Sequence, residues 1–237
     1  MNFSIYQGKW EFHISDGFWK AFTSGVAMIV ATEIGDKTFF IAAVLSMKYS
    51  RSAVFGGSIL ALIIMTVLST FMGLVLPSVL PKKYTHILGG ILFLYFGVKL
   101  ITESRNMEAN RVSEELEEVE EELLHEKKRD KDEEQGEKSN SSSQPKQLNW
   151  YQVFLQALSL TFLAEWGDRS QIATIALAAA KNPYGVTFGG CLGHCLCTGL
   201  AVMGGRMLAA RISEKTVAFW GGCIFLIFGI HSLLFES

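Results

Sequence analysis

Acidic residues are scarce in this sequence outside one segment. Of the 23 acids, 14 lie within residues 105–149, together with 8 of the 21 bases, and only nine lie elsewhere. Residues 18–103 and 150–235 are instead dominated by apolar and small side chains. So little charge over such long stretches argues against a large soluble domain and favours a helical bundle in a membrane.

Cysteines are few, and a cleavable leader is not evident. The chain has four cysteines, all within apolar stretches rather than exposed loops, so a disulfide framework is not expected. Seventeen mainly polar residues precede the first apolar stretch, without the short apolar core of a signal peptide. We therefore expect the first spanning helix to act as its own targeting signal.

Six stretches are apolar and long enough to cross a bilayer, which takes about 20 residues because every backbone amide must be paired within the segment. We therefore predict an all-α membrane protein with six transmembrane helices. The first and fourth stretches are overlong, and each carries an acidic motif near its middle, so we expect both helices to be kinked or locally unwound there. The predicted spans are residues 18–47, 53–76, 85–103, 150–180, 184–208 and 215–235.

The sequence repeats itself at a spacing of 132 residues. Residues 33–38, which read Glu-Ile-Gly-Asp-Lys-Thr, align with residues 165–170, which read Glu-Trp-Gly-Asp-Arg-Ser. Further along, the Phe-Gly-Gly at 55–57 aligns with the same tripeptide at 188–190 if one residue is inserted. These matches indicate a tandem duplication.

The duplication predicts an inverted arrangement. Each half, residues 18–104 and 150–237, has three spans, so the second half must enter the membrane from the side opposite to the first. Inverted repeats of this kind place the substrate site at their interface near the bilayer midplane. A polar N-terminus (1–17) and a charged connector (105–149) complete the chain. Seven basic residues near helix ends lie on the connector's side against five on the other, which predicts a cytosolic connector and lumenal termini.

Within the connector, Val112, Leu116, Val119 and Leu123 are spaced 4, 3 and 4 residues apart. This spacing is typical of about two heptads of helix, which would be either a partner helix or a solvated acidic helix. From residue 130 to 147 the charge and the serine cluster favour disorder. We expect a short helix followed by a disordered segment.

The acidic motifs supply metal-ligand chemistry. Glu33 and Asp36 are three residues apart, as are Glu165 and Asp168, so each pair projects from one side of its segment. Ionised acids in hydrocarbon are costly unless they face a partner, a metal ion or water. Ca²⁺ and Mn²⁺ prefer oxygen ligands, so we predict one divalent-cation site formed by all four acids. Three further side chains could add neutral oxygens to it: Thr38, Ser170 and Gln171.

Protons compete with metal ions for the same carboxylate oxygens, which is the physical basis of exchange. If Lys37 and Arg169 offset two of the four acids, the site would accept one divalent ion or about two protons. Alternatively, the two bases could snorkel or close the gates of the pathway. A simpler interpretation makes each acid a structural ion-pair partner of its neighbouring base, but such a pair needs no symmetric counterpart, so the duplication favours a transport site.

The two acidic motifs resemble the signature of a known protein family. The two motifs, each opening a three-helix half, resemble the E-x-G-D-[KR]-[ST] signature of the Gdt-type cation/proton antiporters, the transmembrane protein 165 family. The resemblance implies exchange of Ca²⁺ or Mn²⁺ for protons, with Glu33, Asp36, Glu165 and Asp168 as binding acids. Residues 193–199 resemble the eukaryotic Golgi branch, which implies a Golgi membrane, supply of Mn²⁺ to lumenal glycosyltransferases and removal of cytosolic Ca²⁺.

Other interpretations stay open at this point. The same carboxylates could line a cation channel, or the bundle could be a membrane anchor that presents its connector to a partner. A homodimer is also compatible with the sequence. His194, which lies near Cys191 and Cys195, could form a soft-metal or proton-relay site, although a single histidine on an apolar helix more often serves packing. We expect no enzymatic activity, no cofactor beyond the transported ions and no nucleic-acid partner.

Overall fold

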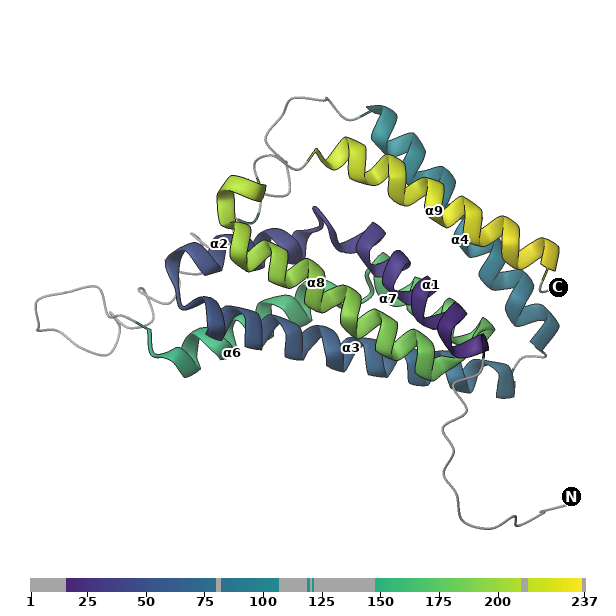
Figure 1. The fold of residues 1–237 in the computed structure, drawn as a ribbon, viewed down its shortest axis with the longest axis horizontal. Helices are drawn as coiled ribbons and strands as arrows, with labels where there is room; N and C mark the ends of the chain where they lie inside the picture. Colours follow the sequence, from purple (N-terminus) through teal and green to yellow (C-terminus); the bar gives the residue numbers. More distant parts are fainter. Residues whose placement is uncertain are drawn as a thin grey trace, which may run out of the picture.

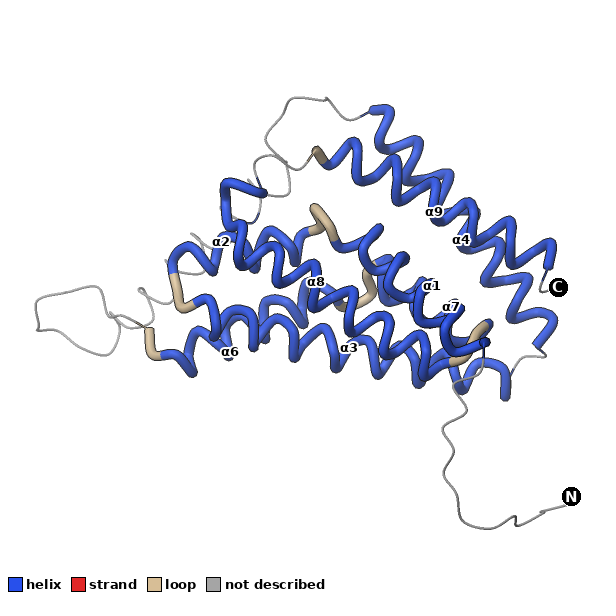
Figure 2. Tube along the Cα trace, viewed as in Figure 1, coloured by secondary structure: helices blue, strands red, loops and turns tan. Residues whose placement is uncertain are grey.

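The computed structural model describes residues 16–79, 82–106, 119, 121, 148–209 and 213–235. The elements that it defines within these ranges are all α-helices (Figures 1 and 2). In chain order they are α1 (Asp16–Glu33), α2 (Lys37–Lys48), α3 (Arg51–Val79), α4 (Lys82–Asn106), α6 (Trp150–Glu165), α7 (Arg169–Ala180), α8 (Pro183–Ala209) and α9 (Glu214–Phe235). The predicted connector helix and disordered segment lie outside the described residues, apart from Val119 and Glu121.

The two overlong stretches are each interrupted at the acidic motif, as the sequence predicts. Helix α1 ends at Glu33 and α2 begins at Lys37, whereas α6 ends at Glu165 and α7 begins at Arg169. Both breaks contain a glycine with positive φ, 78° at Gly35 and 82° at Gly167. Residues with a Cβ rarely adopt this conformation, so glycine is what allows the chain to leave one helix and start the next so abruptly.

Four helices are long and apolar enough to cross a membrane, and they coincide with four of the six predicted spans. Their spanning parts are Arg51–Pro77, Ile87–Asn106, Pro183–Gly205 and Lys215–Leu234. The other two predicted spans are divided into helices of 18, 12, 16 and 12 residues. No single one of these four pieces qualifies as a span, so the count of six spans and their inversion remain predictions.

The buried apolar residues form two clusters, one on each side of the helix breaks. The first cluster joins α2 and α6 to the start of α3 and the end of α8, and it includes Val119 of the connector, which is 1% exposed. The second cluster joins α1 and α7 to α4 and α9. At least one connector residue is therefore part of the helical bundle.

Helices α4 and α9 lie against each other along their length (Figure 1). Glycines bring them close: an added Cβ on Gly97 would lie 2.7 Å from the side chain of Leu226, and one on Gly229 would lie 2.8 Å from that of Leu94. Small residues permit this approach of two backbones in a membrane bundle. The pair packs mainly on α7, through α4, and on α1, through α9.

Helices α3 and α8 each pack across the broken pair of the other half, α3 on α6 and α7, and α8 on α1 and α2. A Cβ on Gly57 would collide with the carbonyl oxygen of Phe154, and one on Gly189 with that of Phe22. Both the glycines and the phenylalanines are 132 residues apart. The one-residue insertion predicted from the Phe-Gly-Gly tripeptides is therefore wrong, because the packing keeps the 132-residue register through α3 and α8.

Candidate cation site

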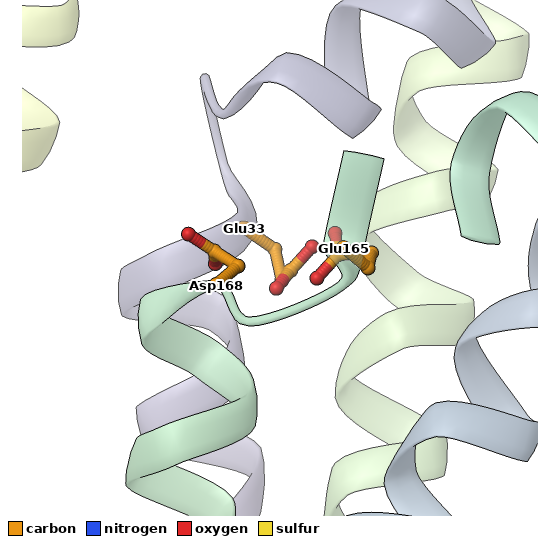
Figure 3. Close-up of side chains that lie close together, drawn as sticks. All are labelled: Glu33, Glu165 and Asp168. Atoms are coloured by element: carbon orange, nitrogen blue, oxygen red, sulfur yellow. The ribbon is translucent and has the colours of Figure 1, made fainter. Parts of the chain in front are cut away.

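The two helix breaks bring acidic side chains from distant parts of the chain together. Glu33 is the last residue of α1 and Glu165 the last of α6, and each is 2% exposed. Asp168 occupies the N-cap of α7. Figure 3 shows the three side chains close together at the two helix breaks, with the carboxylates of Glu33 and Glu165 facing each other. One oxygen from each lies within 4.8 Å of the others, a spacing that a single cation could bridge.

Two hydroxyl groups hold the glutamates in matching ways. Thr38 Oγ1 donates to Glu33 Oε2 over 3.3 Å, and Ser170 Oγ donates to Glu165 Oε2 over 3.2 Å. The second oxygen of each glutamate, Oε1, is buried and has no hydrogen-bond partner among the described residues. Burying unpaired carboxylate oxygens is costly, so two such oxygens in one site point to a cationic ligand.

Asp36 is not one of the three grouped acids, and it pairs with a base from the other half. Its Oδ1 is 3.2 Å from a terminal nitrogen of Arg169, at the start of α7. The same guanidinium lies 3.9 Å from Asp168 and 3.8 Å from Glu103 of α4. Arg169 therefore offsets part of the negative charge and connects Asp36 to the site.

The remaining predicted residues take positions around the breaks. Gln171 Oε1 accepts a hydrogen bond of 2.7 Å from the backbone N–H of Gly167, so its amide fastens the second break. Asp168 accepts from the backbone N–H of Ser170 over 3.1 Å, which caps α7. Lys37 is the first residue of α2 and follows the first break directly. Direct coordination of a cation by Thr38, Ser170 or Gln171 remains a prediction.

A small cavity adjoins the acids. It is bordered by Glu165 at the end of α6, by residues of α7, by His194 of α8, and by a stripe of four residues on α3. The stripe consists of Leu62, Met65, Thr66 and Ser69. A cation reaching the glutamates would thus meet side chains of both α3 and α8, the two helices that cross the broken pairs.

Two residues of this site are missing from the set of ligands that the sequence predicts. His194 is 4% exposed, and its Nδ1 lies 3.8 Å from Glu33 Oε2. The sequence feature that could have identified His194 as a site residue is its position inside an apolar run, but packing is the simpler interpretation of that feature. Glu103 reaches Arg169 from the end of α4. No pattern in the sequence connects Glu103 to the motifs, because it lies 66 residues from Arg169 and outside both copies of the repeat motif.

Comparison with known proteins agrees with this geometry. A model of the GDT1 family, described as "Divalent cation/proton antiporter GDT1", matches residues 21–108 and 153–237. GDT1-like protein 5 of Arabidopsis thaliana is 44% identical over 220 residues, which cover 91% of this chain and 96% of that protein. GDT1-like protein 5 of Oryza sativa subsp. japonica is 46% identical over 219 residues, covering 90% of this chain and 94% of that protein.

A GDT1-like protein of Synechocystis sp. is 42% identical over 212 residues, which cover 90% of this chain and 96% of that protein. No solved structure matches the chain. The family model covers both helix breaks and excludes most of the connector, so the similarity follows the parts that build the site. This chain, a multi-pass membrane protein, belongs to the GDT1 family of divalent cation/proton antiporters.

Proposed function

We propose that this protein exchanges Ca²⁺ or Mn²⁺ for protons across a Golgi-type membrane, with Glu33, Asp36, Glu165 and Asp168 as the acids that bind the transported ion. The observation that carries the proposal is the convergence of three carboxylates from the two halves, with one buried oxygen on each glutamate lacking a hydrogen-bond partner. Hard divalent cations take such oxygens as ligands. Mn²⁺ delivery to the lumen and Ca²⁺ removal from the cytosol would follow from this activity.

Proton exchange follows from the same oxygens. A carboxylate that coordinates a metal ion must release its proton, and a protonated carboxylate no longer attracts the ion. Arg169 offsets Asp36, so fewer than four acid charges remain to balance the cation. We propose that binding of one divalent ion displaces about two protons, because this keeps the charge of the buried site nearly constant through the cycle.

The helix packing supports two inverted halves that alternate in access. The repeat pairs α3 with α8, α1 with α6, and α2 with α7. Each packing contact among these helices has a counterpart between their repeat partners. The α4–α9 pair departs from this pattern, since it packs mainly on α7 and α1. The repeat equivalents of α7 and α1 are α2 and α6. We propose that the pair packs on α2 and α6 in a second state, which opens the site to the opposite side.

The test is metal-driven proton movement in liposomes that contain the purified protein and a pH-sensitive dye. Addition of Mn²⁺ or Ca²⁺ outside should drive protons out of the wild-type vesicles. The double variant Glu33→Gln/Glu165→Gln should lose this response because both grouped glutamates become neutral. Glu121→Gln, at an exposed connector position, is the matched control and should transport normally. Cation entry without proton movement would contradict exchange and favour a channel.

A further inference from the structure

Unpaired polar atoms in this protein concentrate at one place. Among the described residues, five buried side-chain atoms lack a hydrogen-bond partner, and four of them surround the site and its cavity. These four are Glu33 Oε1, Glu165 Oε1, Ser69 Oγ and His194 Nδ1. Since buried polar atoms are nearly always paired, a group of four implies a ligand that satisfies them together. Three offer oxygen, and one offers nitrogen.

The imidazole of His194 lies beside the site and borders the same cavity as the α3 residues. It is 4% exposed and borders the cavity together with Glu165 and Ser170, while its Nδ1 lies 3.8 Å from Glu33 Oε2. That separation exceeds a hydrogen bond, so the histidine does not hold the glutamate in place through one. In the tautomer with the proton on Nε2, the lone pair of Nδ1 is available to a cation.

The equivalent position of the first half has no nitrogen donor. In the 132-residue register that the Gly57 and Gly189 contacts establish, His194 corresponds to Leu62, which is 2% exposed and borders the same cavity. The next position on this face does match, because Thr66 corresponds to Thr198 and both are buried. The glutamates, the hydroxyls and this threonine are therefore duplicated, whereas the nitrogen donor occurs once.

We propose that His194 is a nitrogen ligand of the transported cation and that it biases the site toward Mn²⁺ over Ca²⁺. This inference rests on the proposed function, since it concerns the same site. Ca²⁺ takes oxygen ligands almost exclusively, whereas first-row transition-metal ions also accept imidazole nitrogen. A site made of carboxylates and hydroxyls alone would serve both ions. One imidazole among them adds binding energy for Mn²⁺ and little for Ca²⁺.

Electron paramagnetic resonance tests this directly, because Mn²⁺ is paramagnetic and its coupling to a coordinating ¹⁴N nucleus can be measured. The purified wild-type protein with bound Mn²⁺ should show this coupling, and His194→Gln should lack it. His231→Gln is the matched control, because His231 lies on α9 and borders a different cavity from His194, so this variant should keep the coupling. The wild-type measurement alone decides the matter even if a variant folds poorly.

Affinities supply the second readout. His194→Gln and His194→Leu should weaken Mn²⁺ binding about tenfold, the lower end of what loss of a group at a metal site costs. The affinity for Ca²⁺ should change less than about twofold, because oxygen ligands dominate its binding. Absence of ¹⁴N coupling in the wild type, or equal losses for both ions, would overturn the assignment. Failure of the wild type to bind or exchange either ion would instead overturn the proposed function.

Discussion

The two halves of this molecule carry the same acids but use them differently. In the first half, Asp36 makes no side-chain cap to α2 and pairs with Arg169 across the interface. In the second half, Asp168 caps α7 and joins the two glutamates. Among the described residues that border the site, the histidine comes from the second half. Duplication thus provides a scaffold with matched breaks and matched hydroxyls, and small departures from symmetry determine which groups gather at the candidate cation site.

The largest expected effect tests what the halves share. Glu33→Gln and Glu165→Gln, made singly, should each reduce exchange by at least about 100-fold, more than the loss of an outer-shell partner costs. The two losses should be similar, because each glutamate is equally buried and equally held by one hydroxyl. The measurement is the initial rate of metal-driven proton movement in liposomes. A variant that retained most of its activity would show that the halves contribute unequally.

A cross-link tests the asymmetric position of α4 and α9. A Cβ on Gly89 of α4 would lie 3.8 Å from the Cβ of Ala176 of α7, a spacing that suits a disulfide. In a background without the four native cysteines, Gly89→Cys/Ala176→Cys should stop exchange on oxidation and recover on reduction. Each single variant serves as the control. Full activity in the cross-linked protein would mean that this contact persists through the transport cycle.

The charge pairing of Arg169 gives an effect of intermediate size. Its guanidinium lies close to Asp36 and Asp168, so it weakens the attraction of the site for cations. Arg169→Gln should therefore bind Mn²⁺ about tenfold more tightly, as loss of one nearby positive charge in a partly screened environment predicts. Release should slow, so that exchange falls. Arg169→Lys retains the charge and should stay near wild type. Weaker binding in Arg169→Gln would instead show that Arg169 positions Asp36 as a ligand.

The smallest effect concerns the second helix break. Gly167 has φ of 82° and open space around an added Cβ, so Gly167→Ala introduces backbone strain without a clash. The cost should be about 1–2 kcal/mol of stability. Gly199→Ala is the control, because Gly199 lies within helix α8 with only one ordinary contact. Thermal unfolding of the detergent-solubilised protein should show a lower midpoint for the first variant only.

Sequence reasoning located the breaks and the acids because both depend on local information. An apolar stretch too long for one span, with Glu and Asp flanking a glycine, predicts an interruption at that point, and the structure has one between Glu33 and Lys37. The pairing of Arg169 with Asp36 could not be predicted, because it depends on how two halves dock. The same limit applies to His194, whose apolar neighbours in sequence conceal that it faces Glu33.

The alignment register shows a second limit. Identical tripeptides suggested an inserted residue in the second half, yet the close backbone contacts of Gly57 and Gly189 require none. The position at which a glycine is needed depends on which backbone packs closely against it, and this contact exists only in the folded helical bundle. Short identities in a sequence of many glycines are therefore weaker guides than the spacing of the phenylalanines they pack against.

The ends of the interrupted helices carry electrostatics of their own. Helices α1 and α6 finish at the two glutamates, so the partial negative charges of their carbonyl ends, about half an elementary charge each, are directed toward the site. The opposite, positive ends of α2 and α7 have Asp36 and Asp168 at their N-cap positions, and these carboxylates compensate the positive ends. The backbone itself thus contributes a fixed attraction for cations. A variant that lacks both glutamates should retain this weak attraction for cations, but it should lose the carboxylates at which a cation is exchanged for protons.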